Sequence, residues 1–189
     1  LVFIGQVHAG AWDELKPYVV TEETPIIFSP KDNTLVLEDP QGLLTVEEVL
    51  KRKDEFKPPS EMAPLDTRHH YWIMQKISSG LKADRSHNIY YWGWVSLYTH
   101  VIASDGSVTA LSPSGIVSGY SFLSDIDPAL PGSAKVPTRL PEFILYRGEA
   151  LTLLTHARPI QTAPPKFVLR IVNNERFLET RRFGVYVTG

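Results

Sequence analysis

The stretch YYWGWVSLYTHV at residues 90–101 decides the fold class. It is rich in aromatic and β-branched residues, which favour strands. Alternate positions form two sets. The mainly aliphatic set is Val95, Leu97, Thr99 and Val101, and the aromatic-rich set is Trp92, Trp94, Ser96, Tyr98 and His100. This period of two predicts one strand with two different faces, as in a sandwich with one wet face. Asp105-Gly106 follows and predicts a tight hairpin to a strand at Val108–Leu111.

Further strands are predicted on both sides of this hairpin. They are expected at 34–37, 71–77, 142–146, 150–156, 167–172 and 183–187. The fifteen prolines gather between these segments, where a missing N–H costs least. Many short strands separated by turn residues predict an all-β fold, a β-sandwich or jelly roll.

One short helix interrupts this pattern near residues 46–53. Thr45 and Glu48 have the spacing of a capping box, in which the hydroxyl accepts from the amide three residues on and the carboxylate reaches back. Val46, Val49 and Leu50 then fall on one face of the helix. The sequence therefore predicts a capped amphipathic helix against the sandwich.

Composition indicates an ordinary globular domain. The 189 residues are 43% hydrophobic and 21% charged, enough for one sizeable core. We expect an N-terminal extension or first strand at 1–29 and a β-sandwich domain at 30–189. A net charge of −2 gives no reason to expect nucleic-acid binding, and the absence of cysteine excludes disulfides and thiolate metal sites. No window of about 18 residues is predominantly apolar, so no membrane span is predicted within the chain.

The motifs of common enzyme classes are missing. The sequence contains no glycine-rich phosphate loop, no G-x-S-x-G and no H-E-x-x-H. His69 and His70 are adjacent, so on a strand they would point to opposite faces and could not ligate one metal together. We therefore predict no catalytic residues, no cofactor and no metal. A metal site formed by histidines that converge from distant segments stays open as an alternative.

The aromatic residues are concentrated in one part of the chain. Seven of them lie within residues 71–98: Tyr71, Trp72, Tyr90, Tyr91, Trp92, Trp94 and Tyr98. They fill an aromatic-rich core in one interpretation. In the other, Trp92, Trp94, Tyr98 and His100 share one strand face and bind a ligand, with the rings stacked on the apolar C–H face of a sugar. The sequence leaves both open.

Several short motifs follow one another in a characteristic order between about residues 30 and 175. They are LTVEEV at 44–49, FKP at 56–58, YWI at 71–73, VSLY at 95–98, DG at 105–106 and the hairpin FIL…GE…LTL at 143–153. In order and spacing they resemble the type-2 extracellular domain of bacterial seven-transmembrane receptors with diverse intracellular signalling modules. The chain departs from that pattern at Met74, where the family has Arg, and at Ser79, where it has Asn.

The resemblance implies a jelly-roll sandwich similar to carbohydrate-binding modules, on the periplasmic or extracellular side of the cytoplasmic membrane. An adjoining transmembrane region, absent from this chain, would connect it to a cytoplasmic output. The predicted function is non-enzymatic sensing of a carbohydrate or related small molecule by a bacterial membrane signalling receptor. Two alternatives remain: a carbohydrate-binding module of a secreted hydrolase, and a jelly-roll metalloenzyme.

Overall fold

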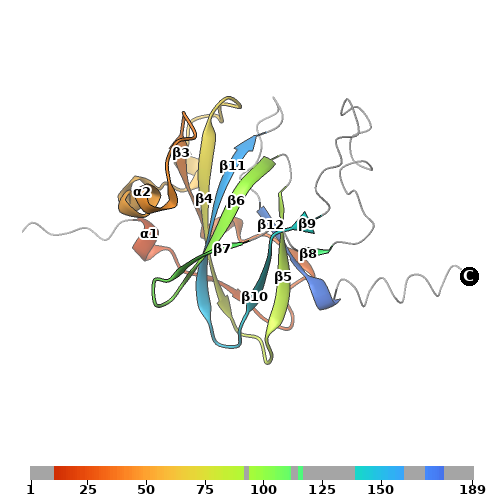
Figure 1. Ribbon diagram of the computed structural model, residues 1–189. Helices are drawn as coiled ribbons and strands as arrows, with labels where there is room; N and C mark the ends of the chain where they lie inside the picture. Colours follow the sequence, from red (N-terminus) through yellow and green to blue (C-terminus); the bar gives the residue numbers. More distant parts are fainter. Residues whose placement is uncertain (1–10, 92–93, 112–114, 117–138, 160–168, 177–189) are drawn as a thin grey trace, which may run out of the picture.

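The computed structural model describes residues 11–91, 94–111, 115–116, 139–159 and 169–176, which are built mainly of β-strands (Figure 1). The helical segments are α1 (Ala11–Glu14), α2 (Val46–Lys51) and 3₁₀ turns at Lys31–Asn33, Lys53–Glu55 and Pro59–Glu61. The strands are β1 (Tyr18–Val20), β2 (Ile27–Phe28), β3 (Thr34–Asp39), β4 (His70–Ser79), β5 (Arg85–Tyr91), β6 (Trp94–Ala103), β7 (Val108–Leu111), β8 (Gly115–Ile116), β9 (Arg139–Leu140), β10 (Glu142–Leu145), β11 (Ala150–Pro159) and β12 (Leu169–Asn173). Across these ranges, no helix has the length and hydropathy that a membrane span requires.

The strands form two main sheets, which confirms the predicted all-β sandwich. The six-stranded sheet has the order β1-β4-β11-β6-β7, with β3 also paired to β4. The four-stranded sheet has the order β10-β5-β12-β2, and β8 pairs with β9. The chain passes from one sheet to the other at each step from β4 to β5 to β6 and again from β10 to β11 to β12. Strand β11 thereby lies between β4 and β6, the winding of a jelly roll.

The residues before position 30 contribute to both sheets. Strand β1 lies beside the end of β4 and runs parallel to it, whereas the other pairings between the described strands are antiparallel. Strand β2 pairs with β12 in the opposite sheet. The first described segments are therefore integrated into the sandwich by backbone hydrogen bonds.

The stretch at 90–101 is not one strand, as its alternation predicts, but parts of two. Strand β5 ends at Tyr91 in the four-stranded sheet, and β6 begins at Trp94 in the six-stranded sheet. In the sequence Gly93 stands between these two segments, and glycine is unfavourable in the interior of a strand. The predicted strand at 183–187 lies outside the described residues.

Apolar layers cover both faces of the six-stranded sheet. The inner layer fills the space between the sheets and consists of Val20, Phe28, Val36, Tyr71, Ile73, Ile77, Leu81, Ile89, Phe143, Leu145, Leu151, Leu153, Ala157 and Ile171. The outer layer packs under the helices and consists of Trp12, Leu35, Leu37, Val49, Phe56, Trp72, Met74 and Leu154. Figure 1 shows α1 and α2 beside β3 and β4, on this outer side. The helices thus cover only part of the outer face.

Helix α2 has the predicted capping box. The Glu48 amide donates to the Thr45 hydroxyl at 3.3 Å, and the Thr45 amide donates to the Glu48 carboxylate at 2.8 Å. The helix ends at Lys51, two residues short of the predicted end, and a 3₁₀ turn follows at Lys53–Glu55. Val49 is buried against the sheet, which fixes the helix on the outer face.

Removing the cap is expected to destabilise the domain. Thr45→Ala should lower the free energy of unfolding by about 1 kcal/mol, because the Glu48 amide loses its acceptor. Urea denaturation followed by circular dichroism measures the change. Thr45→Ser keeps the acceptor and serves as the control, and equal midpoints for the alanine and serine variants would contradict this role of Thr45.

Candidate functional site

The outer face beyond the helices carries a cluster of aromatic and imidazole side chains from three neighbouring strands. His156 of β11 is paired with Trp72 of β4 on one side and with Tyr98 of β6 on the other. The rings of Trp72 and His156 are stacked, with centroids 4.7 Å apart, and Tyr98 lies 4.9 Å from His156. His100 lies 5.6 Å from Tyr98 in an edge-on arrangement. Together with His70 at its edge, these four residues are called the outer-face cluster.

The two deepest members of the cluster form a closed floor. Trp72 is 0% exposed and His156 is 1% exposed. Burial, with a smaller effect from neighbouring His70, lowers the pKa of His156 to about 4, although Asp39 opposes the shift. His156 is therefore neutral at pH 7. Its Nε2 lies 3.3 Å from Nδ1 of His70, so one of the two imidazoles donates an N–H to the other.

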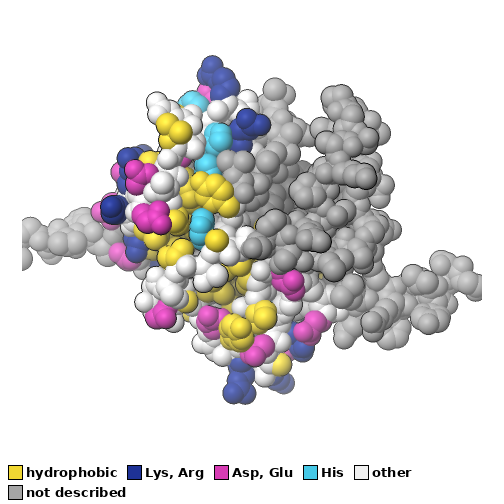
Figure 2. Space-filling view, viewed as in Figure 1, with side chains coloured by type: hydrophobic (Ala, Val, Ile, Leu, Met, Phe, Trp, Pro, Cys, Tyr) yellow, Lys and Arg dark blue, Asp and Glu magenta, His cyan; other side chains and the backbone are white. Residues whose placement is uncertain are grey.

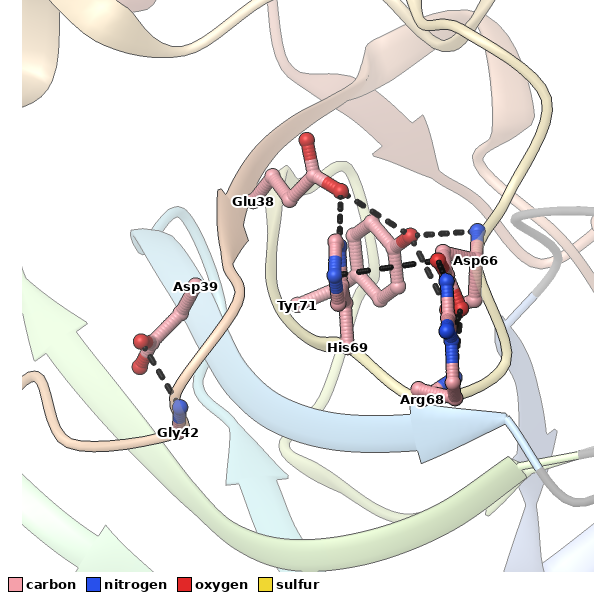
Figure 3. Close-up of polar contacts among 7 residues, drawn as sticks. All are labelled: Glu38, Asp39, Gly42, Asp66, Arg68, His69 and Tyr71. Carbon is pink, nitrogen blue, oxygen red and sulfur yellow. Dashed lines mark hydrogen bonds and ion pairs between the residues drawn. The ribbon is translucent and has the colours of Figure 1, made fainter.

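Asp39, the last residue of β3, holds the loop beside this cluster. Its carboxylate accepts hydrogen bonds from the backbone amides of Gly42, Leu43 and Leu44 at 2.9, 3.3 and 3.0 Å. It also accepts from the indole N–H of Trp72 at 3.4 Å. Figure 3 shows the contact between Asp39 and Gly42. The Asp39 side chain is thus committed to positioning the loop and the indole.

Gly42 allows the loop to approach the cluster closely. Its φ is +68°, a conformation that favours glycine, and a Cβ at this position would lie only 2.5 Å from Nδ1 of His70. A larger residue would therefore displace the His70 ring or the loop. The sequence predicts neither this contact nor the role of Asp39.

The upper members of the cluster face water. Tyr98 is 39% exposed and His100 is partly exposed. The Nδ1 atoms of His100 and His156 are buried, and neither has a hydrogen-bond partner among the described residues. Burial lowers the pKa of His100 as well, with Glu47 opposing the shift, so this imidazole is also neutral at pH 7. Figure 2 shows histidine side chains next to exposed hydrophobic atoms on this side of the molecule.

The structure brings together two of the four predicted site residues. Tyr98 and His100 lie next to each other on the outer face. Trp92 lies outside the described residues, and so does the side chain of Trp94. The backbone of β6 has a register shift relative to β11, since Tyr98 pairs with His156 but Ser96 pairs with Ala157.

A second polar cluster lies near the start of β4 (Figure 3). His69 contacts Glu38 at 2.6 Å through Nδ1 and Asp66 at 3.7 Å through Nε2. Arg68 forms an ion pair with Asp66 at 2.6 Å, and this contact holds the pKa of Asp66 well below its usual range. The Tyr71 hydroxyl donates toward Glu38 at 3.4 Å, and burial raises the pKa of Tyr71 to about 12. The two adjacent histidines contact different partners. His69 joins the 66–69 turn to β3 through Glu38, whereas His70 contacts His156.

The remaining described histidine, His87, is buried between the sheets and is not part of the outer-face cluster. Its ring packs on Phe28 and Phe143, and burial lowers its pKa. Across the described ranges, no group of three or more His, Asp or Glu side chains has the arrangement of a metal site. The outer-face cluster instead combines an exposed aromatic ring with neutral imidazoles.

The fold and this cluster define the chain as a jelly-roll sandwich with an aromatic and imidazole surface on one sheet. The sequence matches no protein-family model, and it matches no curated protein.

Proposed function

We propose that the chain is the extracytoplasmic ligand-sensing domain of a bacterial membrane signalling receptor and that it binds a carbohydrate or related small molecule on the outer-face cluster. The observation that carries the binding proposal is the exposed ring of Tyr98, which stands on a sheet face beside the partly exposed imidazole of His100. The receptor context rests on the motif resemblance, which covers most of the chain.

The cluster has the two properties that a sugar ring demands. A pyranose has an apolar C–H face and a rim of hydroxyl groups that both donate and accept hydrogen bonds. The Tyr98 ring offers an apolar surface fixed by contacts with Trp72 and His156. The Nδ1 of His100 is buried, which leaves Nε2 as the nitrogen that could meet a sugar hydroxyl, as donor or acceptor according to the tautomer.

In a receptor, binding acts through differential affinity. A ligand that binds one arrangement of the domain better than another shifts the population toward it, and the adjoining membrane helices would respond to that shift. The gene sequence on either side of the chain tests this context. Flanking membrane helices support the receptor, whereas an attached catalytic domain would make the chain a carbohydrate-binding module of a secreted hydrolase.

Truncating Tyr98 is expected to abolish most of the binding. Tyr98→Ala should weaken binding of any saccharide found on a glycan array by about tenfold or more, because the stacking surface is lost. Isothermal titration calorimetry measures the affinity. Tyr146→Ala is the matched control, since Tyr146 is 52% exposed but lies in the turn between β10 and β11. A wild-type domain that binds no glycan, or equal affinities for both variants, would argue against the proposal.

A further inference from the structure

Arg158 places a positive charge on the same face as the outer-face cluster. It lies on β11 two residues after His156, and alternate residues of a strand share one face. Its side chain is exposed, and no ion pair joins it to a carboxylate among the residues that the structure describes. Among the described residues, Arg158 is therefore a cation without an ion pair on the face that carries an aromatic ring and several imidazoles.

Three carboxylates around this end of the sheet are already engaged, whereas Glu47 lies near His100 without an ion pair among the described residues. Asp39 accepts from three backbone amides and from the Trp72 indole. Glu38 is held by His69, and Asp66 is held by Arg68 (Figure 3). In Figure 2, basic atoms lie beside the histidines of this face. Among the described residues, neither these three carboxylates nor Glu47 forms an ion pair with Arg158.

We propose that the ligand of the outer-face cluster is an acidic saccharide, and that Arg158 binds its carboxylate while Tyr98 contacts its ring. This inference rests on the proposed carbohydrate-binding function. A guanidinium pairs with a carboxylate through two parallel hydrogen bonds, so one arginine selects for acid over ester.

The spacing along the strand suits one sugar unit. Two residues along a strand span roughly 7 Å, so Arg158 stands about that far along β11 from His156, the cross-strand neighbour of Tyr98. A uronic acid carries its carboxylate on the edge of the pyranose ring. A ring centred on Tyr98 would extend this edge over His156 toward Arg158.

The test compares oligomers of galacturonate, glucuronate and mannuronate with their methyl esters, which have the same rings without the charge. Calorimetry should show that the wild-type domain binds at least one acid about tenfold more tightly than its ester, and that added salt weakens the preference. Arg158→Gln should bind acid and ester equally, at the affinity of the ester. Arg147→Gln, at an exposed arginine in the turn between β10 and β11, should keep the wild-type preference.

The outcomes separate this inference from the proposed function. Binding of neutral saccharides or esters as tightly as acids would overturn the acidic ligand and leave carbohydrate binding in place. An unchanged preference in Arg158→Gln would overturn the role of Arg158. Failure of the wild-type domain to bind any saccharide on a glycan array would overturn the proposed function together with this inference.

Discussion

Replacing Trp72 by alanine is expected to lower the free energy of unfolding by about 3–5 kcal/mol. The indole is 0% exposed and packs in the outer layer beneath the helices. Its removal leaves a cavity, takes the stacking partner from His156 and takes one donor from Asp39. Urea denaturation followed by circular dichroism measures the loss, which is large enough to leave a marginal domain partly unfolded.

Trp72→Phe provides the companion variant. It keeps an aromatic ring on His156 but lacks the N–H that Asp39 accepts, so its stability should fall between those of the wild type and the alanine variant. A cost below about 1 kcal/mol for the alanine variant would mean that the floor of the outer-face cluster is not packed as described.

Acid is expected to destabilise the domain through His156. Its pKa is about 4 in the folded chain against an ordinary value of 6.5, so the unfolded chain binds more protons between these limits. The stability that the folded chain gains from keeping His156 neutral is fully present above pH 6.5. It declines as the pH falls and is gone below about pH 4. This shift in pKa corresponds to about 3 kcal/mol of unfolding free energy. Urea denaturation at a series of pH values would measure it.

His156→Gln isolates this contribution. The variant carries no titrating group at position 156 but keeps His87 and His100, whose pKa values are also lowered. Its stability should therefore depend less on pH than that of the wild type, and the difference between the two curves should grow from pH 4 to pH 6.5. Parallel curves would show that protonation of His156 is not coupled to unfolding.

Features that depend on local chemistry could be predicted from the sequence. The capping box of Thr45 and Glu48 formed because each partner lies within one turn of the other. The hairpin at Asp105-Gly106 connects β6 to β7 as predicted, but only Gly106 has a positive φ, at +84°, whereas Asp105 does not, so the turn is not of the type I′ that Asp-Gly favours. The two-sheet architecture follows from many such local features in succession.

The site could be predicted only in part, because it depends on which strands become neighbours. Tyr98 and His100 are two residues apart, and their shared face follows from alternation. His70 and His156 are separated by 86 positions and meet only because β11 pairs with β4. The backbone of β6 has a register shift relative to β11 between Tyr98 and Ser96, and no residue type in the sequence announces that shift.

Strand β4 has a consequence for how this sequence can evolve. It contributes to the apolar layers on both faces of the six-stranded sheet, through Tyr71, Ile73 and Ile77 on one side and Trp72 and Met74 on the other. A polar substitution in β4 is therefore costly whether the side chain points toward the inner or the outer layer. Strand β7, by contrast, has exposed positions that accept change. Among distant relatives this segment should diverge most slowly, which makes it the best query for finding them.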